Sequence, residues 1–581
     1  MGGEFSNWSS HIGDLKYKKK LSIKEYVIKS KSKLIFLLMV IILGVIISSI
    51  TPYLYGKIID YIVNGDLKSI KNLLFCFATF NIVSIALSIL ENVIGTQITI
   101  GISNDIKYKI FSHILHLKAK EQDQYSTGEL LNRTEGDADA VVSYYINVIT
   151  SWIMIIINLT VSIYFLLKIS KMLTGIGILL LPVNYLINFL FRNRIKIYKL
   201  KEKQKEDGYF KFVNIALSSL KNIKVLLLEK FFSHKFLEIK DEQYKIEIKN
   251  VYLSSLINFL QQFFNQIFEV IIIFISAVFI IKGILSIGMM VSFNSYLEKL
   301  FNAISRLISL NLEKQTLAIS LERINDIQSK EKEIVNENQP IKINKIEFSH
   351  VSFKYDKNEV LRDICFTINE NGLYSIVGEN GSGKTTILKL IDKLYVISKG
   401  EIFINDINID ELELGKLRRS ISYMMKDNLI MPTSLYENII LGCDRVPDND
   451  YLEELCQMLQ LNELKNRIGG LWGEINGDML SSGEKQKVGL ARALVNGSNL
   501  ILLDEATSDM DGSVEKQVVN IIKNLSNNNI IINVGHRREL TFSSKEIYVL
   551  KDGMIVEVGS HEELIKKQGI YSSLFDSKAF I

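Results

Sequence analysis

Cysteine and proline are scarce in this chain, at 4 and 5 residues among 581. The four cysteines show no paired spacing, which excludes a disulfide scaffold and makes a zinc site a poor interpretation. The shortage of proline favours long uninterrupted helices. A net charge of only +4 gives no indication of a nucleic-acid partner, and a hydrophobic content of 48% excludes a disordered protein.

The first half of the chain is strongly apolar. The mean hydropathy of +0.17 is too high for an ordinary soluble enzyme, while 23% charged residues are too many for a protein that lies wholly in a bilayer. Six runs are long enough to cross the ~30 Å hydrocarbon core. These runs are residues 34–54, 73–94, 141–167, 172–191, 258–281 and 284–308. We therefore predict a six-helix membrane domain over residues 34–328.

Basic residues indicate how this domain is oriented. Eight lysines lie in the segment 1–33, before the first run, and the two long loops between the second and third runs and between the fourth and fifth are rich in Lys and Arg. Cytoplasmic loops of membrane proteins carry an excess of Lys and Arg. We therefore expect the N-terminus and everything after the sixth run to be cytoplasmic, in a multi-pass protein of a cell membrane. The Asn-, Ile- and Lys-rich composition favours a bacterial inner membrane.

Apolar residues at helical spacing within the two long loops predict that membrane helices continue into the cytoplasm. After the sixth run, residues 329–342 are polar and predict a linker, followed by a second domain over residues 343–581. Short β-rich runs there alternate with helical patterns, which predicts a mostly parallel sheet with helices on its faces. These runs are residues 346–355, 372–377, 420–425, 499–503, 529–534 and 546–550.

A glycine-rich loop follows the apolar run 373–377 and fits the pattern G-x-x-x-x-G-K-[ST]. Its residues are Gly378, Glu379, Asn380, Gly381, Ser382, Gly383, Lys384 and Thr385, and Thr386 opens the helical stretch behind it. In a strand–loop–helix context, such glycines let backbone N–H groups close around phosphate oxygens. We expect Lys384 to reach the β- and γ-phosphates of ATP and the Thr385 hydroxyl to ligate Mg²⁺.

A second apolar run, residues 501–503, ends in the carboxylates Asp504 and Glu505. An aspartate at the end of such a strand can hold Mg²⁺. The next residue, Glu505, is placed to polarise an attacking water as a general base. The apolar run argues against a merely solvated acidic pair.

The stretch Leu480-Ser481-Ser482-Gly483-Glu484 carries a resemblance to a known family. It is similar to the signature of the ATP-binding cassette (ABC) proteins, which usually reads Leu-Ser-Gly-Gly-Gln. Tyr355 stands where that family stacks a ring on adenine, residues 508–511 at its D-loop, and His536 at its switch histidine. Residues 125–133 and 321–324 resemble segments of exporter membrane domains.

The resemblance implies a half-transporter: a six-helix exporter domain (type I exporter, type IV ABC fold) followed by one α/β P-loop NTPase cassette. It implies an ABC-type ATPase with ATP and Mg²⁺ as ligands and with Glu505 and His536 as catalytic residues. The family works as a dimer, so a second half-transporter is the expected partner, with a homodimer favoured and a heterodimer possible. There Ser481 and Gly483, within the segment that includes Ser482 and Glu484, would contact ATP bound by the partner subunit.

Two departures from the family pattern stand out. Lys426 occupies the Q-loop position, where the family has a glutamine. Lys426 then contacts the γ-phosphate directly, or Asp427 supplies the missing oxygen, or the site hydrolyses slowly; a lysine turned to solvent is the fourth interpretation. In the signature, Ser482 replaces a glycine and Glu484 a glutamine, while Ser481 and Gly483 are kept, so we expect function to survive.

Two glutamates fall within membrane runs. Glu269 shares a face of the fifth span with Asn258, Gln262 and Asn265, and Glu298 shares a face of the sixth with other polar residues. Ionisable groups at membrane depth usually face a cavity or a partner. Either Glu269 and Glu298 line a translocation cavity that favours cationic or amphipathic cargo, or this polar face makes interhelical hydrogen bonds.

The leading hypothesis is ATP-driven export of a hydrophobic or amphipathic compound: a peptide, drug or lipid. Import by an exporter-type fold is a second hypothesis. An ATP-gated channel or sensor that does not pump is a third, against which the presence of Glu505 argues. The sequence does not identify the cargo.

Overall fold

The computed structural model describes residues 30–178, 181–336, 339–443, 446–510, 512–535 and 537–575. They form two compact units. The first comprises Met1–Leu115 and Tyr125–Lys330, and the second His116–Gln124 and Glu331–Ile581. Most of the segment 1–33 and the whole of His536 therefore lie outside the described residues, and the stretch predicted as a linker falls mainly within the second unit.

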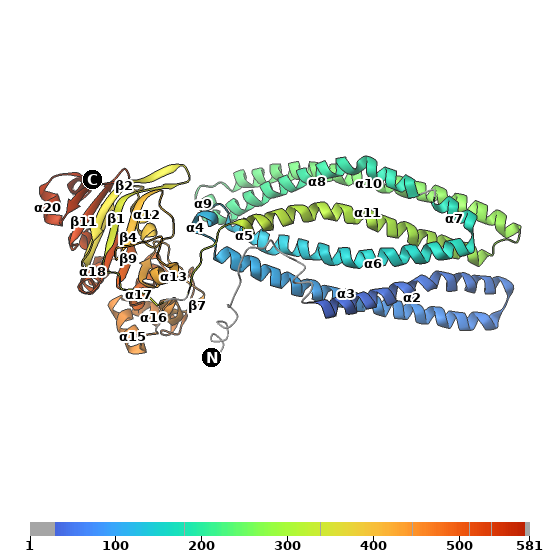
Figure 1. Cartoon of the computed structure of the whole chain (residues 1–581), viewed down its shortest axis with the longest axis horizontal. Helices are drawn as coiled ribbons and strands as arrows, with labels where there is room; N and C mark the ends of the chain where they lie inside the picture. The colour runs from blue at the N-terminus through green and yellow to red at the C-terminus, as the bar shows by residue number, and fades with distance from the viewer. Residues whose placement is uncertain are drawn as a thin grey trace. The chain divides into compact units, whose positions relative to one another are not determined.

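The first unit is built from helices, most of them very long (Figure 1). They are α2 (Lys31–Asn64), α3 (Leu67–Leu115), α5 (Thr127–Asn132), the π-helical turn η3 (Arg133–Asp137), α6 (Ala138–Ile169), α7 (Lys171–Ile178), α8 (Leu181–Ser218), α9 (Leu220–Val225), α10 (Glu229–Ile281) and α11 (Ile287–Ser329). The predicted helical continuation of both long loops is confirmed, because α3 runs to Leu115 and because α8 and α10 cover most of residues 200–249.

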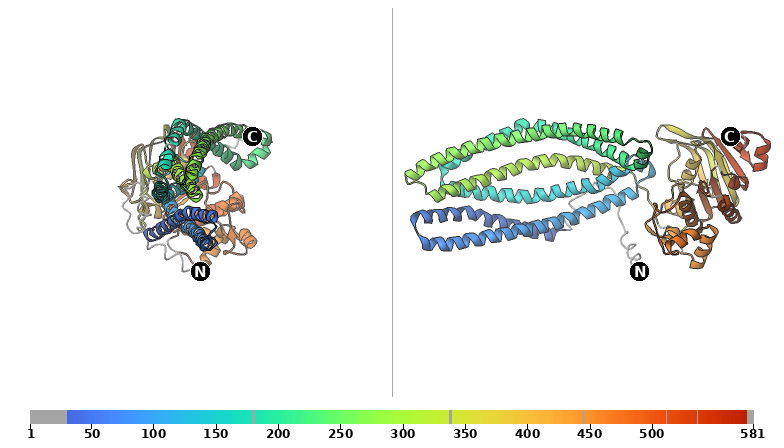
Figure 2. Two further views of the ribbon diagram at one scale, coloured as in Figure 1. Left: turned by 90° about the vertical axis from the view of Figure 1, so that its right-hand side faces the viewer. Right: turned by 180° about the vertical axis from the view of Figure 1, so that it is seen from behind.

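Neighbouring long helices pack in pairs: α2 along α3, α6 along α11, and α8 along α10 (Figure 1 and Figure 2). Among the described residues, four helical stretches are long and apolar enough to cross a membrane: Lys31–Asn64, Leu67–Leu115, Thr127–Ile169 and Glu229–Ile281. The fourth predicted span is divided between α7 and α8, with Pro182 at the start of α8. The sixth lies in α11, which carries more polar residues along its length.

Helix α11 is tied to α2 by polar contacts as well as by packing. Tyr296 donates its phenol hydrogen to the Ser49 carbonyl at 2.7 Å, and the Lys299 ammonium donates to the Ser48 carbonyl. At the far end, Asp60 of α2 accepts hydrogen bonds from the Ser286 hydroxyl and the Gly288 N–H, both at 2.7 Å. Asp60 thereby satisfies backbone and side-chain donors at the start of α11.

The second unit contains two larger sheets. Strands β2-β1-β4-β5 form an antiparallel sheet, and β12-β11-β3-β10-β9-β6 form a sheet that is parallel except for the edge strand β12. Their bounds are β1 (Ile346–Tyr355), β2 (Asn358–Ile368), β3 (Gly372–Gly378), β4 (Lys399–Ile404), β5 (Ile407–Asn408), β6 (Ile421–Met424), β9 (Leu500–Asp504), β10 (Ile530–Val534), β11 (Glu546–Lys551) and β12 (Met554–Gly559); β7 (Thr433–Ser434) pairs with β8 (Glu474–Ile475).

Helices complete this unit (Figure 1). They are α4 (Ala119–Gln122), α12 (Lys384–Ile391), α13 (Leu414–Arg419), α14 (Leu435–Ile440), α15 (Asn449–Met458), α16 (Asn462–Ile468), α17 (Ser482–Val495), α18 (Gly512–Ser526), α19 (Arg538–Phe542), α20 (His561–Lys566) and α21 (Ile570–Phe575). The mostly parallel sheet is thus confirmed, whereas the separate antiparallel sheet was not predicted.

The central sheet is buried on both faces. Along β9, Leu500 and Leu502 belong to one apolar cluster and Ile501 and Leu503 to another. Because successive side chains of a strand point to opposite faces, two cores meet at this sheet. That double burial explains why the parallel strands are continuous apolar runs in the sequence.

A short segment from between α3 and α5 belongs to the second unit. Residues 116–124 are anchored there by the hydrogen bond from the Glu333 N–H to the His116 carbonyl at 2.7 Å and by an ion pair of Lys118 with Glu331. Its Asp123 carboxylate accepts a hydrogen bond of 2.8 Å from the Tyr395 phenol. The sequence placed these residues at the end of a membrane helix and its loop, so this attachment was not predicted.

Close approach of two glycines at the crossing of α2 and α11 gives a prediction about stability. A Cβ atom added at Gly288 would lie 1.9 Å from the Gly56 carbonyl oxygen, which is backbone and cannot swing aside. Gly288→Ala should therefore destabilise the first unit by about 1–3 kcal/mol. Thermal unfolding of the full-length protein in detergent should show a lower transition temperature.

The matched control is Gly95→Ala in α3, where an added Cβ meets nothing within 4 Å. Alanine is the better helix former, so Gly95→Ala should leave the transition unchanged or raise it slightly. Equal transitions for Gly288→Ala and Gly95→Ala would contradict the close crossing.

Candidate functional site

The ends of four parallel strands converge on one edge of the central sheet. Strand β10 pairs in register with both β3 and β9, and β6 pairs with β9 so that Met424 lies beside Leu503. The segments that follow these strands therefore lie next to one another, as ligand-binding loops of parallel sheets do. The glycine-rich loop follows β3, Glu505 follows β9, and Lys426 follows β6.

The glycine-rich loop begins with Gly378, the last residue of β3, and Lys384, Thr385 and Thr386 open α12. The residues between them, Glu379, Asn380, Gly381, Ser382 and Gly383, form the turn. Gly383 has φ +105°, and a Cβ there would lie 2.6 Å from a Leu361 methyl group, so both conformation and space require glycine. The loop thus meets the strand–loop–helix context predicted for it.

Lys384 is almost completely buried, and its ammonium donates to the Gly378 and Glu379 carbonyls at 2.8 Å each. Burial lowers the pKa of Lys384, and the nearby carboxylates Glu505 and Asp504 oppose that shift. The buried hydroxyl oxygen of Ser382 has no hydrogen-bond partner among the described residues. An orphaned buried donor beside a buried cation fits a loop made to receive phosphate.

The two residues predicted to hold Mg²⁺ contact each other. The Thr385 hydroxyl donates to Asp504 Oδ1 at 2.9 Å. Asp504 is only 2% exposed, and burial raises its pKa while the bond from Thr385 opposes the rise. A hydroxyl oxygen and a buried carboxylate are hard oxygen ligands that Mg²⁺ accepts, so these residues fit the metal.

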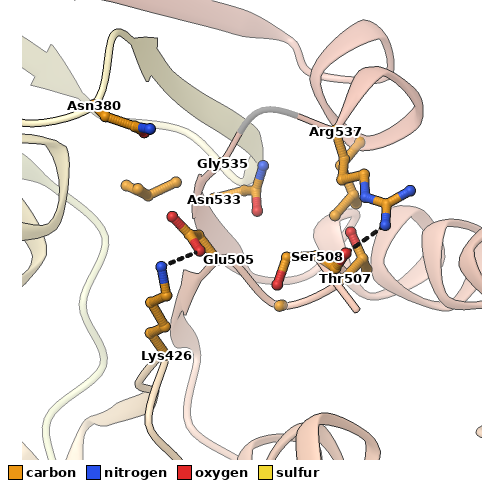
Figure 3. Close-up of a pocket in the computed structure, with 11 residues that line it drawn as sticks. Asn380, Lys426, Glu505, Thr507, Ser508, Asn533, Gly535 and Arg537 are labelled. Atoms are coloured by element: carbon orange, nitrogen blue, oxygen red, sulfur yellow. Dashed lines mark hydrogen bonds and ion pairs between the residues drawn. The ribbon is translucent and has the colours of Figure 1, made fainter. Parts of the chain in front are cut away.

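Glu505 and Lys426 form an ion pair in a cavity of about 320 Å³, where Lys426 Nζ lies 2.7 Å from Glu505 Oε2. Figure 3 shows the two side chains pointing at each other, with Asn380 of the glycine-rich loop on another wall of the cavity. The hydrogen bond to Glu505 raises the pKa of Lys426. Lysine at this position therefore meets the residue predicted as general base, a pairing that the sequence interpretation did not include.

Two further residues fix the segment after Glu505. Gln486 of α17 donates to the Ser508 hydroxyl at 2.7 Å and accepts from the Asp509 N–H at 3.0 Å. Arg537 donates to the Ser508 carbonyl (Figure 3) and lies 3.3 Å from Glu515. Neither Gln486 nor Arg537 was predicted as a site residue; a signal for Gln486 is its place two residues after Glu484 on the same helix.

The signature segment forms the start of α17. Ser481 is the N-cap: its hydroxyl accepts from the Glu484 N–H at 3.2 Å, and the Glu484 carboxylate accepts from the Ser481 N–H at 2.9 Å. Glu484 also lies 3.0 Å from Arg467. Burial acts to raise the pKa of Glu484, but the hydrogen bonds from Ser481 and Arg467 outweigh it, so the pKa lies below its ordinary value. Glutamate in place of the family's glutamine thus completes a capping box.

Gly483 has a steric reason to be glycine, because a Cβ there would lie 2.8 Å from the Asp509 carbonyl oxygen. Ser481, Ser482, Gly483 and Glu484 do not line the cavity that holds Lys426 and Glu505. The structure therefore brings Asn380 of the glycine-rich loop, Glu505 and Lys426 to one cavity and pairs Thr385 with Asp504, while the signature residues lie against the segment that follows Glu505.

Of the remaining predicted residues, Tyr355 ends β1, and its half-buried ring meets Tyr395 edge-on at 5.1 Å between centroids. His536 lies outside the described residues. In the first unit, Glu269 of α10 and Glu298 of α11 are both exposed, and Gln266 donates to Glu269 at 3.1 Å. Exposure of both glutamates leaves the cavity hypothesis untested, because a contact with cargo and a contact with a second subunit would each use an exposed side chain.

Two family models match the sequence. The model of the ABC transporter transmembrane region matches residues 34–304, and the ABC transporter model matches residues 361–508. Together they cover both halves of the chain in the order expected of a half-transporter.

Curated relatives match along nearly the whole chain. An uncharacterised ABC transporter ATP-binding protein of Bacillus subtilis, YfiC, is 27% identical over 572 residues, which are 96% of this chain and 93% of the relative. The lactococcin-G-processing and transport ATP-binding protein LagD of Lactococcus lactis is 27% identical over 550 residues, 91% of this chain and 76% of the relative. A multidrug resistance ABC transporter ATP-binding and permease protein of Lactococcus lactis is 26% identical over 488 residues, 81% of each.

Among solved structures, a bacterial Atm1-family ABC exporter with ATP bound has a TM-score of 0.80 and covers 94% of this chain and 98% of its own, at 20% identity. At this identity the likeness establishes the fold: helical exporter domain followed by cassette. The predicted fold class is confirmed.

Gln486 gives a prediction about the site. Gln486→Leu keeps the volume but leaves the Ser508 hydroxyl and the Asp509 N–H without their partner. Misplacing the segment after Glu505 should lower kcat for ATP hydrolysis about ten- to hundredfold, because small displacements of reacting groups are costly. KM for ATP should change little, since Gln486 does not touch the glycine-rich loop. Steady-state ATPase kinetics of the full-length protein would check both values.

Gln517→Leu on the exposed face of α18 is the control, because the Gln517 side chain only accepts from Gln460 at the surface. It should match the wild type. A Gln486→Leu protein with unchanged kcat would show that these hydrogen bonds do not hold the site.

Proposed function

We propose a function for this chain on the premise that it belongs to the ABC transporter family, as a half-transporter: it uses ATP hydrolysis to export a hydrophobic or amphipathic compound across the membrane. The chain is an ABC-type ATPase and a multi-pass membrane protein. Its fold implies that it assembles with a second half-transporter. Cargo, direction and the roles of individual residues belong to the proposal.

One observation carries the proposal. The Thr385 hydroxyl, at the end of the glycine-rich loop, meets the buried Asp504 at 2.9 Å, with Glu505 as the next residue. A phosphate loop, a metal-binding carboxylate and a second carboxylate in this order suit hydrolysis of a nucleoside triphosphate. Fusion of that unit to membrane helices makes transport the work to which hydrolysis is coupled.

In the proposed reaction Glu505 acts as the general base. Its carboxylate takes a proton from a water molecule whose oxygen attacks the γ-phosphorus, and the bond to the oxygen that bridges the β- and γ-phosphorus atoms breaks, giving ADP and phosphate. Lys384 stabilises the negative charge of the phosphates, and Tyr355 stacks on adenine. Thr385 and Asp504 would hold Mg²⁺, which supplies positive charge at the phosphates.

The half-transporter architecture, with one membrane domain and one cassette in the chain, supports a dimer. Ser481 and Gly483 then contact ATP bound by the partner subunit, so that ATP is enclosed between two chains. Glu505 and the unsubstituted Ser481 and Gly483 suit a subunit that is competent in hydrolysis. A homodimer is therefore the favoured assembly, and lipid bilayer surrounds its helices.

Residues 116–124 suggest how nucleotide binding in the cassette would be transmitted to the membrane helices. Tyr355, the proposed adenine-stacking ring, touches Tyr395, and the Tyr395 phenol holds Asp123 at 2.8 Å. A movement at the adenine ring can therefore reach a segment that is continuous in sequence with α3. Such contiguous contacts are the physical means by which cassette motion would reach the membrane helices.

The cargo class rests on relatives whose names include multidrug resistance and transport of lactococcin G. Inverted membrane vesicles that contain the protein should accumulate an amphipathic cationic dye when supplied with Mg²⁺ and ATP. Depletion of preloaded dye would indicate import, and dye flux that needs ATP binding but not hydrolysis would indicate a channel.

Glu505→Gln tests the proposed chemistry. The amide cannot accept the proton, so kcat for ATP hydrolysis should fall at least about a hundredfold while ATP still binds. Phosphate release by the purified full-length protein in lipid nanodiscs would measure it. Glu401→Gln, at an exposed position of strand β4, is the matched control and should be active. Hydrolysis that survives Glu505→Gln would remove Glu505 from the role of base.

Replacing Glu269 and Glu298 together by Gln tests the proposed cavity. If their carboxylates attract cationic cargo, the double variant should lose stimulation of the ATPase by cationic compounds, by about tenfold in the concentration required, and keep stimulation by neutral ones. Unchanged stimulation and substrate range would assign these residues to helix contacts instead.

A further inference from the structure

We propose that Lys426 is a positioning residue that exchanges partners: it holds the Glu505 carboxylate before ATP arrives and moves to the γ-phosphate when ATP binds, which frees Glu505 to act on water. This inference rests on the proposed function and adds a regulatory step to the same site. Of the interpretations that the amino-acid sequence left open, it selects direct contact of Lys426 with the γ-phosphate, and it adds the order in which Lys426 changes partners.

The sheet itself brings the two residues together. Met424, the last residue of β6, lies beside Leu503 of β9 in a parallel pair, and just beyond the ends of these strands Lys426 Nζ lies 2.7 Å from Glu505 Oε2. Glu505 has φ +54°, a left-handed conformation that is unfavourable in a residue other than glycine. A strained residue beside a cation is a site where position is controlled.

The ion pair between Lys426 and Glu505 is weak enough to be exchanged for another partner. The Lys426 side chain is 61% exposed and that of Glu505 23%, and ion pairs that are partly open to solvent stabilise a protein only weakly. A γ-phosphate carries more negative charge than one carboxylate, and charge-assisted bonds to phosphate are stronger. ATP therefore offers Lys426 a better partner than Glu505, whereas ADP, which lacks the γ-phosphate, does not.

Lys426 is also directed at the right place. It lines the same cavity as Glu505 and as Asn380 of the glycine-rich loop (Figure 3). Asp427, the alternative substitute for the missing glutamine, is exposed and does not line this cavity.

The exchange links two events that must coincide. While Lys426 holds Glu505, the carboxylate that should accept a proton from water is engaged by an ammonium group. Arrival of the γ-phosphate withdraws the ammonium, so the base becomes available when its substrate is present. Departure of phosphate after hydrolysis lets Lys426 return to Glu505.

The test compares two nucleotides. Isothermal titration calorimetry would measure binding of ADP and of the non-hydrolysable analogue AMP-PNP, each with Mg²⁺, to the full-length protein in lipid nanodiscs. Lys426→Met should raise Kd for AMP-PNP about tenfold and leave Kd for ADP within about twofold, because only AMP-PNP has the γ-phosphate. Unchanged ADP binding also shows that the variant is folded.

Two variants match the first. Lys426→Arg keeps the charge and should retain most of the preference for AMP-PNP. Lys416 does not line the cavity, and its ammonium group lies 3.2 Å from the Glu413 carboxylate. The Lys416→Met protein should therefore bind both nucleotides as the wild type does. If Lys426→Met weakens both nucleotides equally, or neither, the exchange is refuted.

A double-mutant cycle tests the exchange itself. Glu505→Gln removes the competing carboxylate, so it should tighten AMP-PNP binding, and it should do so more when Lys426 is present than in the Lys426→Met background. Equal tightening in both backgrounds would reflect simple repulsion between Glu505 and phosphate and would overturn the exchange. Loss of hydrolysis in Glu505→Gln with unaltered selectivity in Lys426→Met would leave the proposed ATPase chemistry standing and reject only this inference.

Discussion

The parallel register of β6, β9, β10 and β3 is the constraint on which the site depends. It places the ends of four strands at one edge of a sheet that is buried on both faces, so the segments after them have no freedom to separate. The glycine-rich loop, Asp504, Glu505 and Lys426 are distant in sequence but adjacent for this one reason. The apolar cores above and below the sheet therefore do more for the site than any single polar contact, because they hold its charged groups at fixed spacing.

The charged groups at this edge of the sheet are only partly neutralised by the protein, and a nucleotide with its metal ion would neutralise them further. Lys384 is buried against carbonyl oxygens of its own loop, and Asp504 is buried against a hydroxyl group. A buried charge that is only partly compensated is costly. In the proposed site, phosphate and a divalent cation would supply the missing charges of opposite sign, so binding would relieve a cost already present in the folded chain. Lys426 and Glu505 differ from this pair in that they are partly exposed, and they already neutralise each other.

The sequence predicted those parts of the structure that depend on local pattern. The runs that became β1, β3, β6, β9, β10 and β11, and the glycine-rich loop with its helix, carry periodicity or spacing that needs no knowledge of distant residues. The parts that it did not predict depend on contacts between distant segments. Residues 116–124 belong to the cassette unit through Glu333 and Tyr395, the antiparallel sheet needs β4 to return beside β1, and Gln486 acquires its importance from Ser508 and Asp509. The residue pattern within any one of these segments does not predict which distant segment it contacts.

The two departures from the family pattern are instructive for the same reason. Glu484 forms an ion pair with Arg467 and accepts a hydrogen bond from the Ser481 N–H. Lys426 forms an ion pair with Glu505. Each unusual charge thus has a partner of opposite sign, which a chance substitution on the way to an inactive site would not require. A degenerate cassette would also be free to lose Glu505, yet Glu505 is kept and held. The altered residues are therefore compatible with the proposed site, in which Lys426 would control when Glu505 is available as the general base.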